Sequence, residues 1–125
     1  MLWDSYVVLA GDLLGQESEA AKRSAVSRAY YGAFNAARRR LEAEGMTIDN
    51  HRTHEQVWRA FRVADGVAAE TAGKWQLVAD LGSSLRGLRN LADYAEVVPA
   101  LDKRAEWAVA IAGRVLTLLD ELEFS

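Results

Sequence analysis

Apolar side chains recur every three or four positions along most of the chain, which is the spacing of one face of an α-helix. This periodicity predicts helices at about residues 2–14, 18–44, 75–95 and 99–122, with another helix starting near residue 53. Alanine, leucine, arginine and glutamate dominate, and no alternating run rich in valine or threonine indicates a strand. We therefore expect an all-α fold, an antiparallel up-and-down bundle of four long helices plus one shorter helix.

Several residues mark the ends of the predicted helices. Gly45 should end the second helix, because glycine adopts the left-handed conformation of a helix C-terminus without strain. Thr53 and Gln56 have the spacing of a capping box at the start of the third helix. Pro99, the only proline, suits the first turn of the last helix. Residues 65–74 carry the weakest pattern and predict a loop or a short helical turn.

The apolar stripes of these helices should meet in one core. The positions expected to be buried are Val26, Tyr30, Ala33, Leu81, Leu85, Leu88, Ala112 and Val115. The third helix has a stripe of its own, made of Val57, Trp58, Phe61 and Ala64. Tyr30 belongs to the core stripe, whereas the neighbouring Tyr31 lies off it and could enter an interface or a cleft.

The second and fourth helices carry small residues on the side away from their apolar stripes. These are Ser24, Ala25, Gly32 and Ala36 on the second helix, and Ala79, Gly82, Ser83 and Gly87 on the fourth. Glycine inside a helix costs ~1 kcal/mol relative to alanine. One interpretation is that these small residues lie on an ordinary exposed surface, where the protein tolerates this cost. The alternative is a second packing surface, and on that interpretation we expect a two-fold homodimer in which these faces take part.

Composition narrows the classes of protein and of site. The chain has 125 residues, half of them hydrophobic and 26% charged, which fits one soluble domain. There is no cysteine, so a disulfide frame, a thiol nucleophile and a thiolate zinc site are all excluded. The formal net charge of −3 gives no overall positive field, so any anion site has to be local.

The N-terminal stretch and the most apolar run do not indicate a membrane protein. "MLWDSYVVLAGDLL" lacks a basic leader and does not resemble a signal peptide. "WAVAIAGRVLTLL" is interrupted by Arg114 and is too short to span a bilayer. We therefore expect a cytoplasmic protein without a membrane partner.

The stretch "RNLADY", residues 89–94, is the strongest candidate for chemistry. Its arginine and amide, Arg89 and Asn90, come one helical turn before a carboxylate and a phenol, Asp93 and Tyr94. Arginine binds phosphate through a permanent charge and a two-pronged set of donors. The opposite interpretation is structural, because Arg89 and Asp93 are four residues apart and can pair along one helix for ~0.2–0.5 kcal/mol.

Three stretches together resemble the HEPN superfamily, the higher eukaryote and prokaryote nucleotide-binding domains. They are "SAVSRAYYGAFNAARRRLEAEG" (24–45), "RTHEQVW" (52–58) and "LRGLRNLADY" (85–94), and they are most similar to the small stand-alone bacterial branch in which an arginine precedes Ala-Asp-Tyr. The similarity covers nearly the whole chain, so it implies a single HEPN-like helical domain over residues 1–125. It also implies a homodimer with a polar cleft and, in many relatives, a metal-independent ribonuclease toxin paired with a nucleotidyltransferase-type antitoxin.

The sequence departs from the catalytic motif of that family, which is an arginine followed, after four to six residues, by a histidine. Arg89 matches the arginine and Asn90 its polar follower, but Tyr94 stands where histidine is expected, and no histidine follows Arg89. A phenol with a pKa of ~10 is a poor base at neutral pH, although it can donate a hydrogen bond or stack on a base. Arg89, Asn90 and Tyr94 therefore retain the binding half of such a site without its proton shuttle.

We accordingly expect a module that binds RNA, a nucleotide or a partner protein without efficient catalysis. The ligand-binding candidates are Arg28, Tyr31, Arg86, Arg89, Asn90, Asp93 and Tyr94. The alternatives are a metal-independent ribonuclease toxin and a purely structural dimeric interaction protein. The catalytic candidates for the ribonuclease are Arg89, Tyr94 and His54, since His54 can reach the cleft from its own helix or from a partner subunit. His51 and His54 have no third ligand cluster nearby, so neither a metal nor another cofactor is expected.

Overall fold

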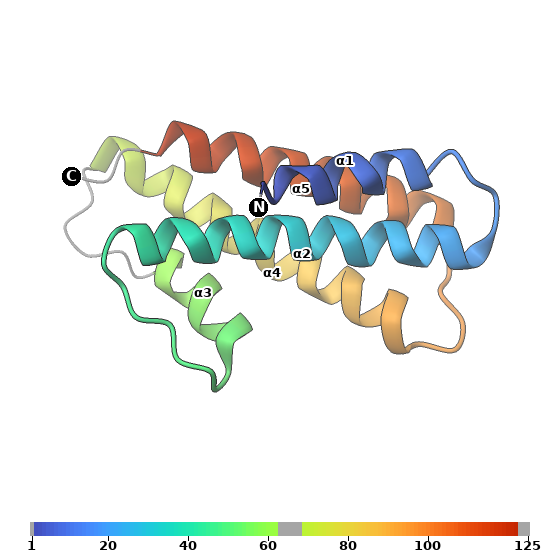
Figure 1. Ribbon diagram of the computed structural model, residues 1–125, viewed down its shortest axis with the longest axis horizontal. Coiled ribbons are helices and arrows are strands. Elements are labelled where there is room, and N and C mark those ends of the chain that lie inside the picture. Colours follow the sequence, from blue (N-terminus) through green and yellow to red (C-terminus); the bar gives the residue numbers. More distant parts are fainter. Residues whose placement is uncertain (1, 63–68, 123–125) are drawn as a thin grey trace.

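The computed structural model describes residues 2–62 and 69–122, apart from the side chains of residues 69 and 70. Its helices are α1 (Asp4–Leu13), α2 (Glu19–Ala43), α3 (Thr53–Arg62), α4 (Ala69–Tyr94) and α5 (Leu101–Glu121) (Figure 1). No strand occurs in this part of the chain, so the all-α prediction is confirmed. Three of the helices are long, whereas α1 and α3 have 10 residues each.

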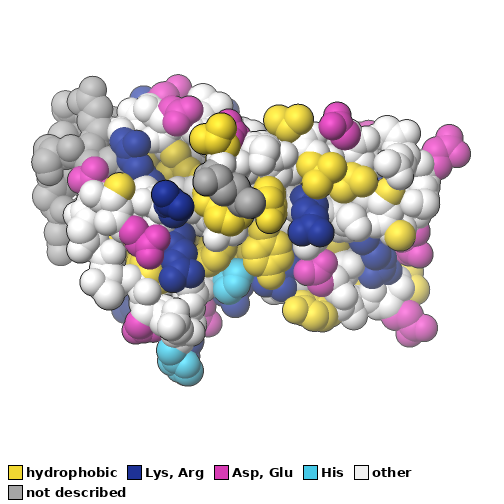
Figure 2. Space-filling model, viewed as in Figure 1, with side chains coloured by type: hydrophobic (Ala, Val, Ile, Leu, Met, Phe, Trp, Pro, Cys, Tyr) yellow, Lys and Arg dark blue, Asp and Glu magenta, His cyan; other side chains and the backbone are white. Residues whose placement is uncertain are grey.

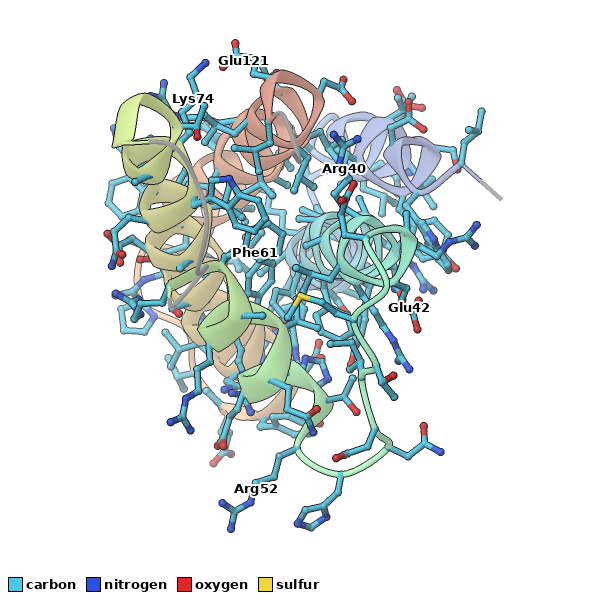
Figure 3. The ribbon with its side chains drawn as sticks, turned by 90° about the vertical axis from the view of Figure 1, so that its left-hand side faces the viewer. Arg40, Glu42, Arg52, Phe61, Lys74 and Glu121 are labelled. Atoms are coloured by element: carbon cyan, nitrogen blue, oxygen red, sulfur yellow. The ribbon has the colours of Figure 1, made fainter. Side chains whose placement is uncertain are left out.

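The long helices lie side by side and alternate in direction. In Figure 1, α2 and α5 run one way while α1 and α4 run the other, which is the expected up-and-down arrangement. α2 contacts each of the other helices, and α3 packs mainly on α4 at one end of the bundle. Figure 3 shows Phe61 pointing from α3 into the space between α2, α4 and α5.

The core lies between the stripes that the sequence predicts. Val26, Tyr30, Ala33, Leu85, Ala112 and Val115 are buried, whereas Leu81 and Leu88 are partly buried at its edge. Val57, Trp58 and Phe61 of α3 are buried as well, and Ala64 lies outside the described residues.

The helix ends agree with the sequence in some places and differ in others. Gly45 has a φ of +88°, the left-handed conformation that ends α2 as predicted. Residues 69–74 belong to the long helix α4, which begins at Ala69, so they form neither the loop nor the short helical turn that the sequence predicted. Residues 65–68 lie outside the described part of the chain. Pro99 precedes α5 instead of lying in its first turn, and Ala100 takes the N-cap position in a left-handed conformation.

The capping box predicted at the start of α3 is not formed. The Thr53 hydroxyl donates to the carbonyl oxygen of Asp49, and the backbone N–H of Gln56, which it would accept from in a capping box, donates to the carbonyl oxygen of Arg52. The Gln56 amide donates to the Asp49 carboxylate at 2.7 Å and to the carbonyl oxygen of His51. These bonds hold the α2–α3 loop against α3, because they satisfy loop groups that a capping box would leave open.

Gly32 of α2 and Gly82 of α4 face other helices of the same chain, whereas Ser24, Ser83 and Gly87 are exposed. A β-carbon on Gly32 would lie 2.9 Å from the carbonyl oxygen of Trp3 and from Cγ2 of Val7, which shows that α1 covers this position. A β-carbon on Gly82 would overlap the indole ring of Trp58 in α3. Gly32 and Gly82 therefore serve the close packing of α1 and α3 within the chain, and assigning these two glycines to a dimer face was wrong.

None of the helices in the described residues is long and apolar enough to cross a membrane.

Candidate anion-binding site

Two arginines of α4 lie one turn apart and face α2 and α3. Arg89 is only 6% exposed, and its Nη1 lies 3.8 Å from Oδ2 of Asp93 and 3.4 Å from the hydroxyl of Tyr94. Both distances are long for a strong interaction, so neither neighbour fully compensates the buried charge. The structural interpretation correctly anticipated the contact between Arg89 and Asp93, but at 3.8 Å this contact is at the outer limit of an ion pair.

Tyrosine rings surround the Arg89 guanidinium. Its central carbon lies 5.3 Å from the ring centre of Tyr30, 5.4 Å from that of Tyr31 and 5.8 Å from that of Tyr94. The negative faces of aromatic rings attract a cation at such distances, and more strongly where water is excluded. Tyr94 itself is 77% exposed, so it covers the arginine from the solvent side and keeps a ring face available.

α3 brings His54 to the same cluster. Its Nδ1 lies 2.6 Å from the hydroxyl of Tyr30, and its ring stacks on Phe34 with the centroids 4.2 Å apart. Burial lowers the pKa of His54 below its ordinary value, and the positive charges of Arg86 and Arg89 lower it further. The imidazole is therefore held neutral beside two guanidinium groups.

Arg86 and Arg89 share an unusual feature. The Nε of each is buried and has no hydrogen-bond partner among the described residues. A buried donor without an acceptor costs ~1–3 kcal/mol, so native proteins rarely leave one unpaired. An oxyanion would offer both groups an acceptor and would also compensate their charge. We refer to Arg86, Arg89 and His54 as the anion cluster.

Shallow depressions lie on both sides of the anion cluster. One, of about 280 Å³ between α3 and α4, is lined by Arg86 together with Glu55, Trp58, Arg59, Arg62 and Ser83. The other, of about 270 Å³ between α2 and α4, is lined by Tyr31, Arg28 and Asp93 with Arg23, Ser24, Ser27 and Ala92. Figure 2 shows a histidine side chain set between hydrophobic and basic ones on the face formed by α1, α2 and α3.

The basic residues of these depressions are only partly neutralised. Arg62 pairs with Asp80 at 2.9 Å, but Arg59 has no ion pair within the described ranges. Arg28 lies over the ring of Tyr6 at 5.8 Å and likewise has no carboxylate partner there. The local balance is therefore positive in a chain whose formal net charge is −3.

A larger hollow lies elsewhere among the described residues. It measures about 740 Å³ between α1, α2 and α5, and Arg39, Arg40, Leu116 and Asp120 are among its lining residues. It contains no residue of the anion cluster and neither Tyr31 nor Asp93, the neighbours of Arg89 that line the depression between α2 and α4. Size alone does not assign a site, and the chemistry favours the smaller depressions.

The structure brings most of the sequence-predicted candidates together. Arg86, Arg89, Asp93, Tyr94 and Tyr31 gather at α2 and α4, and His54 joins them from α3 within one chain. Arg28 lies in the depression that contains Tyr31 and Asp93. Asn90 is the exception, because its exposed side chain makes no hydrogen bond with the described residues.

Sequence reasoning missed the polar roles of Tyr30 and Trp58. Both were assigned to apolar stripes, yet the Trp58 indole N–H donates to the Tyr30 hydroxyl at 3.2 Å. A usable signal was present, because a phenol or an indole placed in a core has to find a hydrogen-bond partner.

Two further findings bear on the class of protein. Within the part of the chain that the structure describes, no three histidine, aspartate or glutamate side chains converge as a metal site requires. Comparisons with protein-family models, with curated proteins and with solved structures returned no match. The site must therefore be interpreted from its own geometry, and the likeness to HEPN domains remains a resemblance in sequence.

Proposed function

We propose that this protein binds a phosphate-bearing ligand, RNA or a nucleotide, at the anion cluster without efficient catalysis. The observation that carries the proposal is the pair of buried, unpartnered Nε donors of Arg86 and Arg89 beside a neutral His54. Guanidinium groups suit phosphate because they are permanently charged and offer several donors in a fixed geometry. The exposed ring of Tyr94 supplies a surface on which a base could stack.

Catalysis is the runner-up, and one contact favours it. Arg89 and His54 both contact Tyr30, so the titrating group that Tyr94 cannot supply is present in the same cluster as Arg89. A metal-independent ribonuclease needs a group that removes the 2′-hydroxyl proton and another that protonates the leaving oxygen. The cluster contains one histidine, and its Nδ1 is already engaged by Tyr30, so we place binding ahead of cleavage.

The binding test uses fluorescence anisotropy with labelled single-stranded RNA. Arg86→Gln should weaken binding by about tenfold or more, because a charge-assisted hydrogen bond contributes ~1.5–3 kcal/mol. Arg114→Gln is the matched control, since it removes the same charge from an exposed position of α5. Equal affinities of the wild type and both variants would refute the anion site and leave the purely structural interpretation.

The same samples, analysed on a gel with a chelator present, test the runner-up. We expect the RNA to remain intact. Robust cleavage that disappears in His54→Gln and in Arg89→Gln would replace the binding proposal with a ribonuclease.

The resemblance to HEPN domains extends the proposal to partners. It implies a homodimer and a nucleotidyltransferase-type antitoxin, as part of a toxin–antitoxin-type system. Exposed large hydrophobic side chains at the end of α4 support an interaction surface there. They are Leu91, Tyr94 and Val97, which are 37%, 77% and 74% exposed. Light scattering of the wild type and of Val97→Lys tests this surface. A wild-type monomer at micromolar concentration would contradict the homodimer.

A further inference from the structure

Tyr30 belongs to the apolar stripe of α2, but its hydroxyl has polar neighbours. It is 0% exposed, and its hydroxyl lies between two side chains of α3, the indole of Trp58 and the imidazole of His54. The three groups form a chain from Trp58 Nε1 through the Tyr30 oxygen to His54 Nδ1, with distances of 3.2 Å and 2.6 Å. The chain ends at a member of the anion cluster.

The number of protons available to these three side chains determines which group donates and which accepts in each hydrogen bond. An indole nitrogen can only donate, so the Tyr30 oxygen accepts from Trp58. Burial is the main cause that raises the pKa of Tyr30 to about 12, so the phenol keeps its own proton at neutral pH. That proton needs an acceptor, and Nδ1 of His54 is at hydrogen-bond distance. Nδ1 then carries no proton, and the neutral imidazole carries its proton on Nε2.

We propose that Tyr30 is a positioning residue that fixes His54 as the Nε2–H tautomer, so that its imidazole offers the anion site a hydrogen-bond donor and not a base. The choice of ligand rests on the proposed function. The tautomer is a property of the free protein and can be measured without any ligand.

The charged form of His54 would conflict with the same contacts. With protons on both nitrogens, His54 would donate to the Tyr30 oxygen, which already accepts from Trp58. The phenol proton would then lose its acceptor in a fully buried place.

The charges around the imidazole also favour the neutral form of His54. The titratable and charged groups that face His54 are Tyr30 and Tyr31 from α2, together with Arg86 and Arg89 from α4. The two guanidinium groups oppose another positive charge. An Nε2–H donor beside these arginines suits an oxyanion, whereas base catalysis at Nε2 would need the lone pair that this tautomer lacks.

The experiment is a long-range proton–nitrogen NMR spectrum of the imidazole side chains at neutral pH, recorded on nitrogen-labelled free protein. In the wild type, His54 should show one protonated and one unprotonated nitrogen, with the proton on Nε2. Tyr30→Phe should give a mixture that includes the Nδ1–H tautomer. Tyr31→Phe is the matched control and should leave the wild-type pattern, because its hydroxyl makes no hydrogen bond with the described residues.

Three results would overturn the proposal: a wild-type His54 protonated on Nδ1, a wild-type His54 charged at neutral pH, or an unchanged tautomer in folded Tyr30→Phe. Trp58→Phe gives a second variant if Tyr30→Phe does not fold, and it should keep Nε2–H because the Tyr30 hydroxyl that donates to His54 is retained.

Titration with inorganic phosphate separates this proposal from the proposed function. An Nε2–H tautomer that does not respond to phosphate would support the role of Tyr30 while contradicting the anion site. If the wild-type protein responded to phosphate but His54 were protonated on Nδ1, the anion site would be supported and the role of Tyr30 would be contradicted.

Discussion

The indole ring of Trp58 occupies the space beside Gly82 in which a β-carbon would lie. Trp58 is buried in α3 and Gly82 is buried in the middle of α4, so this contact sets how closely the two helices approach. The same indole donates to Tyr30, which in turn bonds to His54. A glycine on one helix therefore helps to place a histidine on another.

Gly82→Ala should destabilise the protein by about 1–3 kcal/mol, the usual cost of overpacking a rigid core site. This outcome opposes helix propensity, which favours alanine over glycine by ~1 kcal/mol. Gly87→Ala is the matched control on the same helix, because a β-carbon there meets no atom within 4 Å. It should stabilise the protein by up to ~1 kcal/mol. Urea denaturation measures both, and equal effects of the two substitutions would refute the close contact.

Arg23 fastens the end of α4 to α2. Its Nη1 donates to the carbonyl oxygens of Ala92 and Ala95 at 3.1 and 2.5 Å, and its Nη2 donates to that of Glu96 at 2.8 Å. Arg23→Met keeps the apolar stem but removes these bonds, so we expect a loss of about 1.5–3 kcal/mol. Amide hydrogen exchange should also accelerate in residues 92–97.

Arg38→Met is a suitable comparison for that measurement. Arg38 makes an i,i+4 ion pair with Glu42 at 3.6 Å on the surface of α2. Such a pair contributes about 0.3–0.5 kcal/mol, so the loss should be small. If Arg23→Met destabilised the protein no more than Arg38→Met, Arg23 would not hold the end of α4.

Stability should decline in mild acid because of His54. Its pKa is lowered in the folded protein, mainly by burial and then by Arg86 and Arg89, from an ordinary value of 6.5. Well above pH 6.5 the imidazole is neutral in both the folded and the unfolded state, and its contribution to stability is fully present. As the pH falls from there toward the lower folded pKa, the unfolded chain binds a proton that the folded chain excludes, and the free energy of unfolding falls.

Thermal unfolding across that pH range measures the effect. His54→Gln should flatten the decline in melting temperature, whereas His51→Gln, which replaces the exposed histidine of the α2–α3 loop, should leave it in place. An equal slope in the wild type and in His54→Gln would show that another group is responsible.

Binding of single-stranded RNA should depend on salt only modestly. Contacts from two or three arginines to phosphate predict a slope of about −1.4 to −2.1 in a plot of log affinity against log salt, at ~0.7 per phosphate on a single strand. Anisotropy titrations at several salt concentrations give this slope, and Arg86→Gln should reduce its magnitude by about 0.7. A much steeper slope would indicate a basic surface larger than the anion cluster and its two depressions.

The sequence by itself determined the helices and most of the core. The positions of Val26, Ala33, Leu85 and Val115 follow from a period of 3.6 residues, because a helix needs one continuous apolar stripe to bury. The role of Gly45 at the end of α2 could also be predicted from the sequence, since a positive φ at a helix end is a local property that glycine tolerates. The chemical candidates Arg86, Arg89 and Asp93 were also visible, because spacings of three and four residues place them as neighbours on one helix.

Only the tertiary structure decided what the small residues are for and which groups meet at the site. Gly32 and Gly82 were interpreted as a dimer face, yet α1 and α3 cover them, and helical periodicity cannot tell a partner subunit from another helix of the same chain. Likewise, Tyr30 and His54 are 24 residues apart, and nothing local joins them. Their hydrogen bond exists because Trp58 packs against Gly82 and sets α3 on α4, a relation between three helices that no single stretch of sequence contains.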